Sequence, residues 1–377
     1  MIDSIEKALS PISLAASFLG FGILRYPLNH QSRYRLSIFY ILTVWSVYAL
    51  ISIIITICEH EKYWQHIRKL DLVDDTLEEL GIPKEYRKMR NLTRKALITW
   101  FLMICATWTL DSLVCIGILH DTRTIFIPFV TTYTVYVNSI TDITFILLLR
   151  HIGDRLDKIN DHIINQLSET EDCGLRCKWK KFLVVNGHYV RNAKNRKHIL
   201  WTVIHLHLEL CRTARNINNF FGIQMTLQMI SSFVTLNGMF YFEYYIILHL
   251  KEIAKNNMAF NILLSDTMWF SILFVKLISL NHICESVSAK AQRTKNIIHK
   301  LTNLIYFAEV REEIYQFVLQ ISLRPLKFTG WGLFYFGYDF IRKFFVWTLT
   351  TIIFMAQINF IPVWIEIKKD NRTYYSK

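Results

Sequence analysis

The stretch that decides the fold is Phe344–Ile365, which reads FFVWTLTTIIFMAQINFIPVWI and carries no charged residue. A helix of about 20 apolar residues crosses the roughly 30 Å hydrocarbon core of a bilayer, so this stretch is long enough for one span. It contains the amide side chain of Gln357. An amide at that depth is expected to face another helix or water, because lipid offers it no hydrogen-bond partner. The stretch therefore predicts either a packed span or the wall of a pore.

Five similar runs precede this one in the chain. They are Leu36–Cys58, Ala96–Leu119, Ile125–Leu149, Phe220–Phe242 and Met258–Leu280. None of them alternates between apolar and polar residues as the strands of a membrane β-barrel do. With 52% hydrophobic residues overall, the chain is predicted to be an all-α polytopic membrane protein, a helical bundle of six or seven transmembrane helices.

The formal net charge of +13 reflects membrane topology, and we do not expect nucleic acid as a partner. Only Arg123 is basic between the second and third runs, and only Lys251 and Lys255 between the fourth and fifth, whereas the other intervals are rich in Lys and Arg. The positive-inside rule places those basic intervals in the cytoplasm. We therefore expect a multi-pass plasma-membrane protein with an extracellular tail, in which Asn371 of an Asn-Arg-Thr sequon is a candidate glycosylation site.

The intervals between the spans give the domain organisation. Apolar residues recur at helical spacing after the third span, as at Ile152, Leu156 and Ile159, which predicts amphipathic helices that extend the spans into the cytoplasm as an anchor domain. The glycine-punctuated segment Phe328–Tyr338 is expected to form a short helix before the last span. The expected order is an interfacial segment 1–35, transmembrane helices 36–149 with a cytoplasmic loop 59–95, anchor helices 150–219, transmembrane helices 220–280, anchor helices and the short pre-pore helix 281–343, the last helix 344–365 and the tail 366–377.

The residue pattern indicates neither an enzyme active site nor a metal site. There is no Gly-rich phosphate loop and no nucleophile elbow. His205 and His207 are two residues apart, which does not place two ligands on one helix face. Cys173 and Cys177 lack a second pair at zinc-like spacing. We expect no enzyme, no metal and no cofactor.

A candidate ligand pocket comes from polar and aromatic residues inside the spans. A carboxylate in a span is costly unless it pairs or reaches water, which makes it a functional candidate by default. The residues chosen are Trp108, Asp111, Tyr136, Asp142 and Trp269. The alternative is that the carboxylates bond to neighbouring helices and that the aromatic rings serve packing and the interfacial belts.

The residues around Gln357 resemble the signature of the insect gustatory receptor family, which is Thr-Tyr, five hydrophobic residues and Gln-Phe in the last helix. Here Thr350 and Gln357 fit, while Thr351 replaces the Tyr and Ile358 replaces the Phe. Gly337-Tyr338-Asp339-Phe340 resembles the lead-in to that helix. Further similar segments are Leu206–Leu210 running into Asn216–Gly222, and Leu70–Gly81, which resembles the first cytoplasmic loop of the family.

The resemblance implies a seven-helix receptor of chemosensory neurons with a cytoplasmic N-terminus and an external C-terminus. It implies a homo- or hetero-tetramer, assembled through the cytoplasmic extensions and the last helices. The last helix would line a central non-selective cation pore that a small-molecule tastant opens. The pore and gate residues would be Gln357, Ile358, Phe354, Ile353 and Ile361.

The chain departs from the family pattern near its N-terminus. The Leu70–Gly81 segment follows the first clear span here and the second helix in the family, so about one helix fewer is expected. Three alternatives therefore stay open. They are a seven-helix receptor that signals through a G protein, a transporter, and a truncated receptor that does not conduct.

Overall fold

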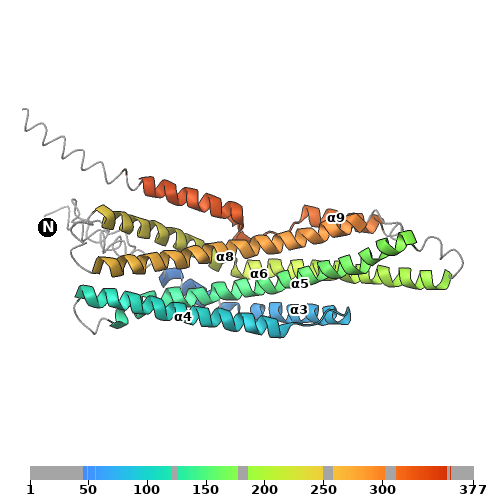
Figure 1. Ribbon diagram of the computed structural model, residues 1–377, viewed down its shortest axis with the longest axis horizontal. Coiled ribbons are helices and arrows are strands. Elements are labelled where there is room, and N and C mark those ends of the chain that lie inside the picture. Colours follow the sequence, from blue (N-terminus) through green and yellow to red (C-terminus); the bar gives the residue numbers. More distant parts are fainter. Residues whose placement is uncertain are drawn as a thin grey trace, which may run out of the picture.

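The computed structural model describes residues 46–48, 50–55, 57–119, 125–176, 186–248, 258–301, 311–354 and 357. The interfacial segment 1–35, the start of the first span, Ile358, Ile361 and the tail with Asn371 lie outside these residues. Long helices run roughly along one axis of the molecule (Figure 1). The elements are α3 (His60–Glu79), α4 (Tyr86–Leu119), α5 (Ile127–Arg176), α6 (Asn186–Leu248), α8 (Met258–Leu301), α9 (Arg311–Leu323), β1 (Thr329–Gly330) and β2 (Phe334–Tyr335), followed by a helix over 338–354.

The lengths of the helices explain how one chain spans a membrane and reaches beyond it. The 63 residues of α6 make a helix of about 95 Å, roughly three times the hydrocarbon thickness. Three helices in the described part of the chain are long and apolar enough to cross a membrane: Tyr86–Gly117, Thr131–Ile164 and Phe260–His299. The all-α polytopic class predicted from the sequence is thus confirmed.

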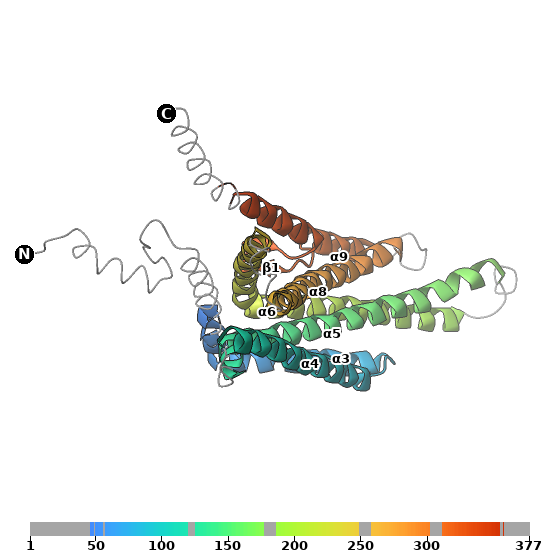
Figure 2. The same cartoon turned by 60° about the vertical axis from the view of Figure 1, so that its left-hand side comes forward.

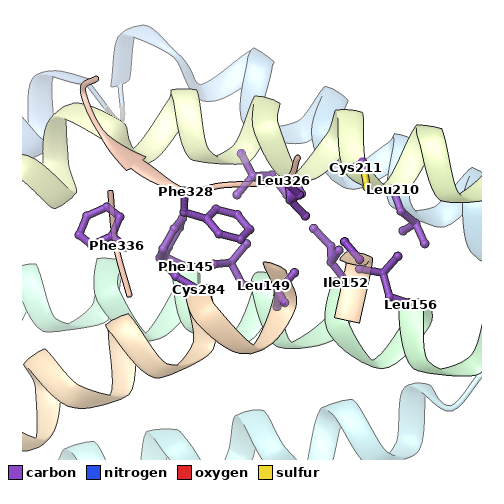
Figure 3. Close-up of a cluster of buried hydrophobic side chains, with 14 of the residues drawn as sticks. Phe145, Leu149, Ile152, Leu156, Leu210, Cys211, Cys284, Leu326, Phe328 and Phe336 are labelled. Atoms are coloured by element: carbon purple, nitrogen blue, oxygen red, sulfur yellow. The ribbon is translucent and has the colours of Figure 1, made fainter. Parts of the chain in front are cut away.

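One hydrophobic core joins most of the elements and continues from the predicted spans into the part of the molecule predicted to be cytoplasmic. On α5, Phe145, Leu149, Ile152 and Leu156 are fully buried at helical spacing. They pack towards α6, α8 and the segment after α9, which carries Phe328 (Figure 3). α8 packs against four helices, α4, α5, α6 and α9, and α5 packs against α4, α6 and α8. The helix 338–354, drawn in red, diverges from this bundle in both views (Figure 2).

The expected cytoplasmic loop 59–95 is wrong for most of its length, because α3 occupies His60–Glu79. The signal was present in the sequence: Leu70, Val73, Asp74 and Leu77 have helical spacing, and all four are buried. The helix ends in a Schellman turn, in which Gly81 N donates to Glu78 O at 2.8 Å and Ile82 N to Leu77 O at 3.0 Å. Gly81 adopts a φ of 86°, which glycine tolerates without strain.

The short helix expected over Phe328–Tyr338 is also wrong, because this segment forms the antiparallel hairpin β1–β2. Thr329 pairs with Tyr335 and Gly330 with Phe334. The turn between the strands needs positive φ, and Trp331 and Gly332 adopt 44° and 75°. The glycines that punctuate the segment therefore favour a tight turn over a helix. The hairpin separates α9 from the last helix.

Candidate functional site

A cavity of about 510 Å³ lies between α4, α5 and α8. Apolar and aromatic side chains from each helix form most of its wall, among them Trp100 and Met103 of α4, Val135 of α5, and Trp269 and Ile272 of α8. Its size falls within the range of about 300–1,000 Å³ typical of pockets for small organic molecules. A wall of this composition favours an apolar ligand with few polar groups.

An ion pair between Asp142 on α5 and Lys276 on α8 forms the charged part of the cavity wall. The Asp142 side chain is 3% exposed and that of Lys276 is 12% exposed, so the pair lies almost out of solvent. The pair ties the two helices together, since removal of one partner would leave the other charge buried. Asp142 thus combines the two roles that the sequence left open: it bonds to a neighbouring helix and it lines the cavity.

Asp111 on α4 accepts hydrogen bonds from two side chains of α8, those of Trp269 and Ser265. The Trp269 indole Nε1 donates to the carboxylate oxygens of Asp111 at 3.3 and 3.1 Å, and the Ser265 hydroxyl donates to Oδ1. The ring of Trp269 stacks on Tyr136 of α5, with centroids 6.3 Å apart and planes at 19°. Trp269 is therefore held in place from α4 and from α5.

The structure brings together four of the five residues predicted for the pocket. Asp142 and Trp269 line the cavity, while Asp111 and Tyr136 position Trp269. The Tyr136 hydroxyl is itself buried and 2.8 Å from Thr107 Oγ1. Trp108 takes no part, because its Nε1 donates at 3.1 Å to the carbonyl of Ile125, before α5.

Most residues of the cavity wall were missed from the sequence, among them Trp100, Met103 and Lys276. Trp100 and Met103 lie on one face of α4. From the sequence alone, an apolar residue of a span is interpreted as facing lipid or the core, and a residue that lines a cavity cannot be distinguished from these. Lys276 was considered only as a partner of Asp266 on the same helix. Its actual partner, Asp142, is on α5, and only the packing of the two helices reveals the pair.

The predicted pore residues that the structure describes are uncovered within the subunit. Ile353 and Phe354 are 50% and 60% exposed, and Gln357 is exposed. The hydroxyls of Thr350 and Thr351 bond to the carbonyls of Val346 and Trp347 in their own helix, both at 2.9 Å. The two threonines of the motif are therefore satisfied locally, and the Gln357 face remains available to lipid, water or another subunit.

Two buried asparagines attach the hairpin to the bundle. Asn218 of α6 accepts a hydrogen bond from Thr329 N at 3.1 Å and donates from Nδ2 to Thr329 Oγ1 at 3.3 Å. Asn281 of α8 accepts from Gly337 N at 2.9 Å. A Cβ at Gly337 would collide with the carboxylate of Glu285, also on α8. The helix that lines the cavity therefore also fixes the residue that precedes the last helix.

A second buried ion pair joins α3 to α5 at the other end of the bundle. Arg155 contacts Asp74 through two nitrogens, with Nε 2.7 Å from Oδ1 and Nη2 2.9 Å from Oδ2, and His151 Nε2 lies 3.2 Å from Oδ2. Burial alone would raise the pKa of Asp74. The hydrogen bonds and charges of His151 and Arg155 outweigh burial, so the pKa of Asp74 is lowered.

The residues that the structure describes form no recognisable metal-binding site. No three His, Cys, Asp or Glu side chains there gather closely enough to hold an ion.

Comparisons with known proteins agree on one family. The family described as "7tm Chemosensory receptor" matches residues 12–360. A candidate gustatory receptor of Drosophila melanogaster, 28b, is 22% identical over 277 residues, which are 71% of this chain and 58% of that protein. The matched part of this chain thus spans less than two thirds of that relative.

Two solved structures share the fold. The olfactory receptor OR5 of the insect Machilis hrabei superposes with a TM-score of 0.56 at 16% identity, covering 93% of this chain and 87% of that one. The same receptor in complex with eugenol gives a TM-score of 0.55 at 15% identity, covering 94% and 89%. These matches show the shared fold, and the family match over residues 12–360 shows that the chain belongs to the 7tm chemosensory receptor family of insects.

Proposed function

We propose that the chain is a gustatory receptor subunit of a tastant-gated, non-selective cation channel in the plasma membrane of sensory neurons. The observation that carries this proposal is the double role of α8. Trp269 and Lys276 of α8 line the cavity, and Asn281 of the same helix binds Gly337 before the last helix. A ligand that changes the position of α8 therefore acts on the N-terminal end of the last helix.

Opening follows from a shift between two states. A ligand favours the open state only by the difference in its affinity for the open and closed cavities. The cavity favours a small, largely apolar tastant, and the relative from Machilis hrabei is described in complex with the small aromatic eugenol. Trp269 would transmit the ligand's contact to Asp111 and Tyr136, and α8 would transmit it to the hairpin.

The pore would form where the last helices of four identical or related subunits meet. Gln357, Ile358, Phe354, Ile353 and Ile361 would make an apolar constriction with a ring of amides, a pattern suited to gating by dewetting. In the part that the structure describes, Ile353, Phe354 and Gln357 have exposed side chains, as a pore lining requires of a single subunit.

The anchor domain would hold the subunits together in the cytoplasm. α9 turns an apolar stripe outward, in which Tyr315, Leu319 and Leu323 are 46%, 58% and 73% exposed. Residues at this spacing share one face of the helix, and a second subunit would remove them from water. In this proposal the N-terminus lies in the cytoplasm and the tail with Asn371 lies outside the cell, as the distribution of Lys and Arg along the sequence predicts.

The experiment is a recording from cells that express the chain, with surface labelling as the control for delivery. A panel of sugars, bitter compounds, amines and apolar aromatics is applied, and a cation current is expected from at least one apolar compound. A tag after Lys377 should be accessible on intact cells. An internal tag would favour a G-protein-coupled receptor, and saturable uptake without channel currents would favour a transporter.

A further inference from the structure

A polar cavity of about 90 Å³ lies between α6, α8 and the end of α9, separate from the ligand cavity. Its volume is several times the roughly 10–15 Å³ that one water needs. Basic and amide side chains dominate its polar wall: His207 and Arg215 of α6, Gln292 of α8, and Gln320 and Arg324 at the end of α9. No carboxylate lines it among the residues that the structure describes.

His207 gives this cavity a buried ring nitrogen with no hydrogen-bond partner. The residue is 1% exposed, and its Nδ1 has no hydrogen-bond partner. Its Nε2 lies 3.5 Å from the sulfur of Cys211, one turn along α6, a residue visible beside Leu326 in Figure 3. Burial, with the charge of Arg215, lowers the pKa of His207 to about 4, so the ring is neutral at cytosolic pH. Burial raises the pKa of Cys211 to about 11, so its thiol keeps its proton.

With a neutral ring and a protonated thiol, the contact between Cys211 and His207 can form in two directions, and its direction decides the tautomer of His207. A neutral imidazole has one N–H donor and one acceptor nitrogen. When the Cys211 thiol donates to Nε2, Nδ1 carries the ring proton and becomes a donor. Because Nδ1 is buried without a partner, it bears the desolvation cost of an unmade hydrogen bond. An acceptor in the cavity would remove that cost.

The two arginines determine the charge of that acceptor. Arg215 uses Nη2 to donate to the carbonyl of Arg324 at 2.8 Å, and a guanidinium has four further N–H groups. The neutral imidazole, two amides and two guanidinium groups give a cavity with positive charge and many donors. Guanidinium groups form their strongest hydrogen bonds with carboxylate and phosphate oxygens.

We propose that this cavity is a binding site for a phosphate group, presented on the cytoplasmic side of the membrane. Its place favours such an occupant, because Arg215 lies only five residues before the predicted span that begins at Phe220. Basic pockets at this level between membrane helices bind phosphorylated lipid headgroups, and free cytosolic phosphate offers the same chemistry. The occupant would join α6, α8 and α9 beside the hairpin. The proposal rests on the lining of the cavity and on the predicted span, and not on channel activity.

The test is a titration of the purified full-length protein in detergent, read by the rise in its thermal unfolding midpoint. Inorganic phosphate is added in one arm, and a short-chain phosphatidylinositol phosphate in the other, with chloride adjusted to keep the ionic strength constant. Binding in the second arm alone would identify a lipid headgroup as the source, and binding in both would identify phosphate in either form.

Arg324→Gln is the variant that should weaken binding, because it removes a guanidinium while the backbone carbonyl that Arg215 uses remains. We expect its apparent Kd to rise about tenfold or more, the loss expected for a charge-assisted hydrogen bond. Arg212→Gln is the matched control, since Arg212 is exposed and pairs with Glu209 at 3.5 Å. If Arg324→Gln is less stable, its Kd is measured by calorimetry below its unfolding midpoint. Absence of saturable binding in both arms, or equal weakening by the two variants, would overturn the proposal.

Discussion

The side-chain oxygen of Asn281 accepts a hydrogen bond from the backbone nitrogen of Gly337 at 2.9 Å, although the two residues are 56 positions apart. Asn281 is fully buried, and its Nδ2 donates to Leu277 O at 2.9 Å within α8. Both the oxygen and the nitrogen of the Asn281 side chain therefore have a hydrogen-bond partner. The bond links the helix of the ligand cavity to the last helix through a segment that cannot carry a side chain at Gly337 without meeting Glu285.

Asn281→Ala should weaken both the fold and the coupling. The change leaves Gly337 N buried without a partner, which costs about 1–3 kcal/mol. We expect a lower thermal unfolding midpoint and a shifted ligand concentration for half-maximal current. Ser288→Ala is the control, because the Ser288 hydroxyl bonds only to Cys284 O in its own helix. Identical behaviour of the two variants would contradict the role assigned to Asn281.

Changing one partner of the buried ion pair between Asp142 and Lys276 should destabilise the protein more than changing both partners together. Asp142→Asn or Lys276→Met alone leaves one charge uncompensated and should destabilise the protein by about 3–5 kcal/mol. The double variant should recover part of that loss. A double-mutant cycle on thermal unfolding measures this coupling, and strictly additive effects would mean that the pair contributes no interaction of its own.

Filling the cavity should block ligand action without harm to the fold. Met103 lines the cavity, whereas its neighbour Leu102 is 61% exposed on the outer face of α4. Met103→Trp should raise the ligand concentration for half-maximal current at least about tenfold, because the added ring takes up ligand volume. Leu102→Trp should leave the response unchanged. Equal responses from both variants at equal surface expression would place the ligand elsewhere.

Asp74 should confer a defined pH dependence on stability. Its folded pKa is lowered below its ordinary value, so its contribution is complete above that ordinary value, about 3.8, and is lost as the pH falls through the folded pKa. Asp74→Asn should therefore reduce the free energy of unfolding at neutral pH by several kcal/mol. The difference from wild type should shrink only under strongly acidic conditions.

The control for this experiment is Asp75→Asn. Asp75 is the adjacent residue, is exposed and pairs with Lys84 at the surface. It should have little effect on unfolding at any pH. A difference between wild type and Asp74→Asn that already vanishes near pH 6 would contradict the lowered pKa.

The sequence was sufficient to predict the class of fold, because several charge-free runs of span length in one chain are typical of membrane-spanning helices. It also singled out residues that the structure places at or beside the cavity, because Asp111, Asp142 and Trp269 are costly or bulky in a span and must have partners. It did not name those partners. The pairs Asp142–Lys276 and Asp111–Trp269 each join two helices, so they depend on the packing of the bundle.

The two errors in the intervals between the predicted spans have different causes. α3 was missed because charged residues surround its apolar positions, although Leu70, Val73 and Leu77 keep the spacing of a buried face. The hairpin was missed because its strands have only two residues each, too few for a period-2 pattern. In Phe328–Tyr338 the glycines indicated the hairpin better than the pattern of apolar residues did.

The central claim is that the last helix lines a pore opened by a ligand in the α4–α5–α8 cavity. Its most direct test is a single-channel recording of wild type and Gln357→Ala during application of an activating apolar compound. Ile140→Ala, an exposed residue of α5, serves as the control. We predict that Gln357→Ala changes unitary conductance, ion selectivity or gating and that Ile140→Ala changes none of them. Currents unaltered by Gln357→Ala would contradict the account.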